Sequence, residues 1–102
     1  MNIAEKVSGT TVWTPSKNAV ACEVEGEIVL LDLQSGTYFG LNGVGTQIWN
    51  QLTQQKTFDE IQQHLLSRYR VTPERCEAEV LALLTKLKDK GLVRNHSDET
   101  AA

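Results

Sequence analysis

The residues of this chain that could do chemistry do not stand in catalytic patterns. His64 lies in the middle of an expected helix, and His96 lies near the C-terminus. Both are interpreted as solvated histidines on the surface. Neither Ser35 nor Ser67 stands in a Gly-x-Ser-x-Gly pattern, which is typical of a nucleophilic serine. The glycine-rich segment GLNGVG, residues 40–45, lacks the Gly-Lys-Ser/Thr of a phosphate-binding loop. The sequence therefore predicts no catalytic residue, and the protein is not expected to be an enzyme.

Metal binding is not indicated either. Cys22 and Cys76 are far apart and lie outside any Cys-x-x-Cys or histidine-rich context. They are interpreted as two half-buried thiols in a reducing cytosol rather than as a disulfide or a metal site. Asp59 and Glu60 fall in the first turn of an expected helix, where capping and the helix dipole explain them. We expect no bound metal ion and no cofactor.

Length, composition and charge predict one small domain that resides in the cytoplasm. The chain has 102 residues, of which 40% are hydrophobic and 23% charged, enough for a single core. Its net charge of -3 argues against a nucleic-acid partner, because the phosphate backbone demands a basic face. The N-terminus has no apolar segment typical of a signal peptide, and no apolar run reaches membrane-spanning length. Neither a nucleic acid nor a membrane is expected as a partner.

Three strands are expected in the first half of the chain. Residues 19–24 alternate apolar and polar side chains, and Glu25-Gly26 signals a tight turn into a second strand over residues 27–33. That strand is apolar on both faces, so either both faces are covered or one is left for another contact. A third, short and aromatic strand spans residues 37–41 and runs at once into a helix. Its free edge is expected to lie open, where a peptide can add a strand.

Three helices are expected in the second half. The first spans about residues 44–53 with Asn42 as its N-cap. The second begins at Thr57, where Thr-Phe-Asp-Glu fits a capping box. The third begins at Thr72, which a proline follows, and ends at Gly91. Three strands followed by three helices predict an α+β fold that is winged helix-turn-helix-like, with a three-stranded antiparallel sheet in front of the helices.

The two ends of the chain are expected to lie outside this fold. Residues 1–18 are polar with scattered apolar positions, and they are interpreted as a flexible N-terminal arm or a frayed extra strand. Residues 95–102 read as a disordered tail. The domain itself is then residues 19–94.

A winged-helix DNA-binding regulator is an alternative function, because such a fold places its last helix in the major groove. Here that helix begins TPERCEAEV, with three glutamates and one arginine at the end that would approach the phosphates. Electrostatics therefore disfavour DNA. A small structural or oligomerising module is a further alternative.

Three segments stand out together in this chain: LLDLQSGTYFGLNGVGTQIWNQL, TFDEIQQHLLSRY and LTKLKDKGLV. They resemble the PqqD-like family, also called RiPP recognition elements, which bind the leaders of ribosomally made, post-translationally modified peptides. The most specific parts are the DxxxGxYxxLN pattern from Asp32 to Asn42, the Ile48-Trp49 pair, and Gly91-Leu92-Val93. The likeness runs from about residue 19 to residue 93 and is closest to stand-alone members of lasso-peptide pathways.

The resemblance implies a non-catalytic adaptor that binds a precursor's leader as an extra antiparallel strand beside residues 37–41. It implies two further partners, a separate leader-cleaving cysteine protease and a cyclase. A peptide chaperone of pyrroloquinoline quinone or another radical-SAM-modified peptide is the alternative within the family. Leader side chains would enter a cleft between the third strand and the third helix. The implied peptide-binding residues are Thr37, Tyr38, Phe39, Gly40, Leu41, Val80, Leu83, Leu84 and Leu87.

Strand and helix periodicity predict which of these side chains are core. Phe39 and Leu41 should face inward together and Tyr38 outward, because neighbours in a strand alternate. On the third helix, Leu83 and Leu87 are expected in the core. Leu84, at the edge of the apolar stripe, is the better candidate for the wall of the cleft.

Overall fold

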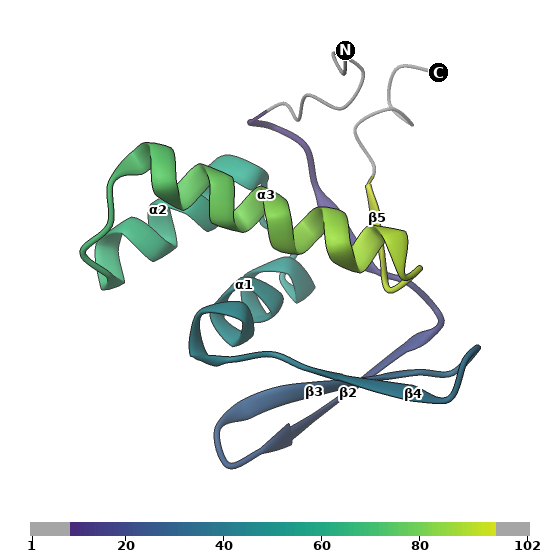
Figure 1. Cartoon of the computed structure of the whole chain (residues 1–102). Coiled ribbons are helices and arrows are strands. Elements are labelled where there is room, and N and C mark those ends of the chain that lie inside the picture. Colours follow the sequence, from purple (N-terminus) through teal and green to yellow (C-terminus); the bar gives the residue numbers. More distant parts are fainter. Residues whose placement is uncertain (1–8, 96–102) are drawn as a thin grey trace, which may run out of the picture.

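In the described part of the chain, four strands precede three helices and a short fifth strand follows them, which confirms the α+β prediction (Figure 1). The computed structural model describes residues 9–95. The elements are, in chain order, β1 (Trp13–Pro15), β2 (Ala19–Val24), β3 (Glu27–Asp32), β4 (Thr37–Gly40), α1 (Gly43–Thr53), α2 (Phe58–Arg68), α3 (Pro73–Asp89) and β5 (Val93–Asn95). The likeness to a winged helix-turn-helix is loose, because a second ribbon of β1 and β5 joins the two ends of the described chain.

Each helix begins where its capping residue predicts. The Asn42 side chain accepts a hydrogen bond from the backbone N–H of Gly45, which starts α1. Thr57 and Glu60 form the expected capping box at the start of α2. The Thr72 side chain accepts a hydrogen bond from the backbone N–H of Arg75, the third residue of α3. These bonds satisfy N–H groups that have no partner within the helix, so the three N-termini are set locally.

The three-stranded sheet has the order β2-β3-β4 and is antiparallel throughout, with β4 at one edge. One face packs against α1, which lies between the sheet and α3 in Figure 1. Leu30 of β3 is fully buried on this face and pairs with Phe39. On the other face Leu31 pairs with Tyr38, which is 70% exposed. The apolar residues on both faces of β3 therefore reflect one core face and one that no described element covers.

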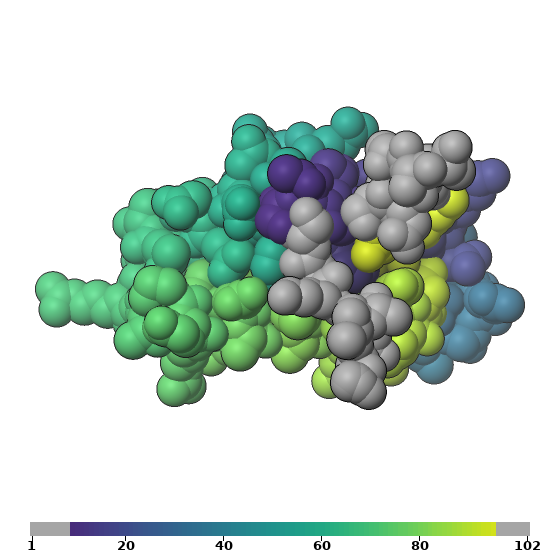
Figure 2. Space-filling view, turned by 90° about the horizontal axis from the view of Figure 1, so that it is seen from above, coloured from purple at the N-terminus to yellow at the C-terminus, as the bar shows by residue number. Residues whose placement is uncertain are grey.

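The described part of the expected N-terminal arm is packed, which corrects the expectation of a flexible segment there. Trp13 is 2% exposed and belongs to the core, and β1 pairs with β5 in the register Thr14↔Arg94. Thr11 accepts a backbone hydrogen bond from Phe58. Figure 2 shows these purple residues between the teal start of α2 and the yellow β5. Burial of the indole ring holds the segment, as the extra-strand alternative requires.

Residues 1–8 and 96–102, with His96 and most of the expected tail, lie outside the described residues. Within residues 9–95, no helix combines the length and the apolar character needed to cross a membrane.

Trp49 anchors α1 in the core and yields a stability prediction. Its side chain is 3% exposed. Trp49→Ala should lower the free energy of unfolding by about 3–5 kcal/mol, because a large cavity is left behind. For a domain of this size the melting temperature should fall by at least about 12 °C. Asn50→Ala changes the exposed neighbour on the same helix and is the matched control. Equal melting temperatures for the two variants would show that Trp49 is not a core residue.

Candidate functional site

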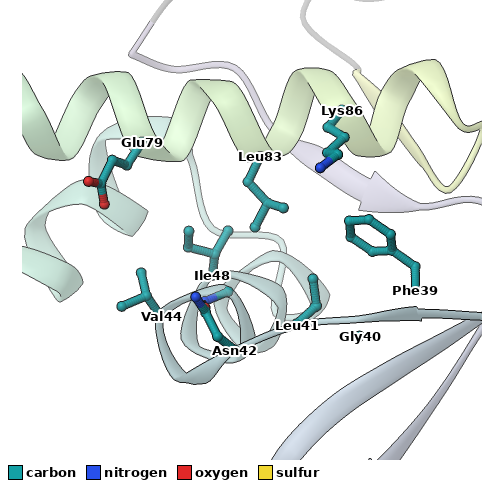
Figure 3. A pocket seen from close by; sticks show the side chains of 10 residues that line it. Phe39, Gly40, Leu41, Asn42, Val44, Ile48, Glu79, Leu83 and Lys86 are labelled. Atoms are coloured by element: carbon teal, nitrogen blue, oxygen red, sulfur yellow. The ribbon is translucent and has the colours of Figure 1, made fainter.

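A hollow of about 260 Å³ lies between β4 and the middle of α3, with the first turns of α1 as its floor (Figure 3). In Figure 3 Leu83 points from α3 toward Ile48 of α1, and Phe39 rises from β4 beside them. We call this hollow the β4–α3 groove. It is lined by Phe39, Gly40, Leu41, Asn42, Val44, Gly45, Ile48, Glu79, Leu83 and Lys86.

The floor of the groove is apolar because α1 approaches β4 closely. A Cβ atom at Gly45 would lie 3.2 Å from the Cβ of Leu41 and 3.4 Å from Oδ1 of Asn42. Glycine therefore allows the capped first turn of α1 to sit directly against the end of β4. Val44 and Ile48, one turn apart, then face the groove: Val44 is half-buried, whereas Ile48 is 2% exposed and closes the floor as part of the core.

The two ends of the groove carry opposite charges (Figure 3). At one end, the ammonium groups of Lys86 and Lys90 each lie 5.4 Å from the centre of the Phe39 ring, a cation–π distance. At the other end lies Glu79, whose Oε2 is 3.0 Å from Nε of Arg75. Both partners of that ion pair are largely exposed, so Glu79 stays accessible to a ligand.

The register of β4 shows which of its backbone groups are free. Leu41 donates its N–H to the carbonyl of Ile28 at 2.8 Å, so this pair is of the hydrogen-bonded kind. Bonded and non-bonded pairs alternate along antiparallel strands. Phe39 therefore faces β3 with its backbone, while Tyr38 and Gly40 direct their N–H and C=O groups to the open edge. A strand added there can make up to four backbone hydrogen bonds with these two residues.

Sequence reasoning places the β4 side chains correctly. Leu41 is buried and Phe39 half-buried on the inner face, whereas Tyr38 and Thr37 are exposed. Phe39, Gly40 and Leu41 line the groove, as the resemblance implies.

The expected orientation of α3 is wrong. Leu84, the expected wall residue, is 0% exposed in the core, and Leu83, expected in the core, lines the groove. Val80 and Leu87 are also core residues. The core stripe runs through Cys76, Val80, Leu84 and Leu87, and at 100° per residue its centre lies close to Val80. Leu84 and Leu83 lie on opposite sides of that centre, about 45° and about 55° away, so the helical pattern alone hardly separates them.

Several lining residues, among them Val44, Glu79 and Lys86, are not among the peptide-binding residues that the resemblance implies, although each lies in a recognisable sequence pattern. Glu79, Leu83 and Lys86 are spaced by four and three residues, which puts them on one face of α3. Val44 and Ile48 are one turn apart directly after the third strand. Each pattern identifies a helix face, but only the packing of α1 and α3 beside β4 shows that the two faces meet.

The other reactive side chains stand apart from the groove. Cys22 is exposed and Cys76 buried, so the expectation of two half-buried thiols is wrong for both. Desolvation by burial, with a smaller contribution from Glu79, raises the pKa of the Cys76 thiol. His64 is half-buried rather than solvated, and its Nε2 lies 2.8 Å from Oε1 of Gln47. Among residues 9–95, no three His, Cys, Asp or Glu side chains gather as metal ligands would.

Comparisons with known proteins give a consistent result. The structure described as "TbiB1 in Complex with the TbiA(beta) Leader Peptide" has a TM-score of 0.76 and 36% identity, over 79% of this chain and 94% of that chain. The structure described as "Lasso peptide synthetase B1 complexed with the leader peptide" has a TM-score of 0.75 and 28% identity, over 80% and 96%. No curated protein matches the sequence. The profile of the family described as "Coenzyme PQQ synthesis protein D (PqqD)" matches residues 27–93, and the chain belongs to this family.

Proposed function

We propose that this protein is a non-catalytic adaptor that binds the leader of a ribosomally synthesised precursor peptide. The leader adds an antiparallel strand to β4, and alternate leader side chains enter the β4–α3 groove. The adaptor presents the bound leader to a separate leader-cleaving protease, and a cyclase completes a lasso peptide.

The observation that carries the proposal is a strand edge that no element within residues 9–95 pairs with, beside an apolar groove. Tyr38 and Gly40 direct backbone groups to the open edge of β4, and the half-buried Leu83 and Val44 offer apolar surface beside it. Backbone pairing supplies affinity for any extended peptide, whereas the groove adds selectivity through a buried side chain.

The comparisons favour a lasso-peptide role over the alternative within the family. The family description refers to coenzyme PQQ synthesis, which supports a peptide chaperone of that pathway. Both similar structures, however, are described with a leader peptide, and the second as a lasso peptide synthetase B1. They span more than nine tenths of their own length in the alignment, so the likeness covers their whole described fold.

Binding of DNA is disfavoured by the surface of α3. Its first turns expose Glu74, Glu77 and Glu79, which would repel phosphates in a groove of DNA. A salt series separates the two functions, because DNA binding collapses between low and physiological salt and an apolar peptide anchor weakens only modestly.

Amide exchange tests the proposal directly. Where a short precursor peptide is encoded beside this gene, its synthetic leader is the probe and is added in excess to ¹⁵N-labelled protein. The amides of Tyr38 and Gly40 should exchange at least about fivefold more slowly with the peptide bound, since each gains a hydrogen bond worth about 1 kcal/mol or more.

The opposite edge of the sheet provides an internal control. Leu33 donates to the carbonyl of Asn18 at 2.8 Å, so alternation directs the amides of Ala21 and Glu23 of β2 outward. These amides should exchange equally fast with and without the peptide. Protection at β2 with none at β4, or no binding of the leader at millimolar concentration, would overturn the proposal.

A further inference from the structure

Charges are segregated around the β4–α3 groove. Between Lys17 and Lys56 the sequence contains no Lys or Arg, so the sheet and α1 are free of positive side chains. The lysines beside the groove come from the last turns of α3. A ligand on β4 therefore meets an acidic surface at one end of the strand and a basic surface at the other. The positions of the charged side chains along β4 show which end is which.

The acidic end lies where β4 runs into α1. A second hollow adjoins the groove there and shares Gly40, Leu41 and Asn42 with it. Glu25 and Glu27 of the β2–β3 hairpin line this second hollow. With Glu79 across the groove, three carboxylates surround the end of β4. The one cation paired with any of them in the described chain is Arg75, on the far side of Glu79.

The basic end lies at Phe39, toward the start of β4. Lys86 and Lys90 share the Phe39 ring, and among residues 9–95 neither pairs with a carboxylate within salt-bridge distance. Asp32, which pairs with Thr37 at the start of β4, is engaged in its own turn. Its carboxylate accepts from the N–H of Gln34 at 3.0 Å and from the Ser35 hydroxyl at 2.9 Å. Two ammonium groups without a counter-ion are a preformed site for an anionic side chain.

The direction of the added strand converts this layout into a sequence order. β4 runs from Thr37 to Gly40, so an antiparallel peptide runs from the Gly40 end to the Thr37 end. Its N-terminal part then lies at the acidic end and its C-terminal part beside Lys86 and Lys90. The apolar anchor lies between them, over Leu83.

We propose that the groove selects a peptide in which a basic residue precedes the apolar anchor and an acidic residue follows it, each within about three residues, the reach of an extended chain along β4. The inference rests on the proposed function. It adds that the bound segment is recognised by its charge order as well as by its apolar residue.

A displayed library tests this inference without knowledge of the natural ligand. Random sixteen-residue peptides are selected against the full chain at low ionic strength, where exposed charges are least screened. Enriched peptides should share an apolar anchor with Lys or Arg on its N-terminal side and Asp or Glu on its C-terminal side. Peptides of reversed charge order should bind about three- to tenfold more weakly, the scale for exposed charge pairs turned into repulsions.

Charge-reversal variants of the protein assign the preference to the groove. Lys86→Glu should weaken a selected peptide about three- to tenfold, and replacing the peptide's acidic residue by Lys should restore its affinity. Lys88→Glu makes the same change in the same helical turn but outside the groove, so its affinity should match the wild type. Glu79→Lys and its outward neighbour Glu77→Lys form the corresponding pair for the basic residue.

The outcomes distinguish this inference from the function on which it rests. Peptides that bind through an apolar anchor without any charge order, or with the reverse order, overturn the inference and leave the proposed function standing. Equal effects of Lys86→Glu and Lys88→Glu also overturn it, since general charge would then explain the preference. A library that yields no peptide protecting β4 removes both.

Discussion

Tyr38→Pro should abolish or strongly weaken leader binding while the domain stays folded. The N–H of Tyr38 points to the open edge of β4, so proline removes no hydrogen bond within the sheet. Proline is tolerated on edge strands in this orientation. It removes a donor to the added strand and places its ring at the edge, which should lower affinity at least about tenfold. Fluorescence polarisation with a labelled leader measures the loss, and circular dichroism measures the fold.

Two variants of β4 separate the backbone contribution from the others. Tyr38→Ala keeps the N–H donor and removes only a ring that is 70% exposed, so most of the affinity should persist. Phe39→Pro places proline where the backbone faces β3, so the sheet should lose stability. A Tyr38→Pro protein that is folded and binds with wild-type affinity would rule out strand addition at β4.

Local features of this fold are predictable from sequence because they depend on residues within one turn. Asn42, Thr57 and Thr72 each bond an N–H three residues ahead, and each helix begins at the predicted position. Alternation alone places Tyr38 outward and Phe39 inward. These short-range rules therefore predict where each helix begins and which β4 side chains face inward.

Long-range contacts decide the features that sequence reasoning misses. Trp13 is buried because β1 meets β5, and nothing near Trp13 in the chain announces a partner at the other end. The rotation of α3 is a similar case. Leucines at 83 and 84 give the helix apolar residues on two faces, so periodicity cannot tell the core face from the groove face. Only the positions of α1 and the sheet assign Leu84 to the core and Leu83 to the groove.

Three successive residues of α3 should respond in three different ways to the same charge. Leu84→Glu should unfold the domain, because it buries an unpaired carboxylate at a position that is 0% exposed and removes a core leucine. Its cost of at least about 4 kcal/mol is a large part of the 5–15 kcal/mol that stabilises a typical domain. Thermal melting followed by circular dichroism should show a strongly lowered or absent transition.

Leu83→Glu should leave the fold intact and weaken leader binding. Leu83 is half-buried at the groove, so a glutamate there can reach solvent, with Lys86 one turn away. Loss of the apolar contact with the anchor should cost about 1–3 kcal/mol in binding, which is about fivefold to 150-fold in affinity. Ala82→Glu adds the same charge on an exposed neighbour and should change neither stability nor affinity appreciably. The comparison is decisive because the three variants place the same charge at successive positions of one helix. If Leu83→Glu melts as early as Leu84→Glu, residue 83 is part of the core. If it is folded and binds the leader as tightly as Ala82→Glu, the peptide's anchor lies outside the β4–α3 groove.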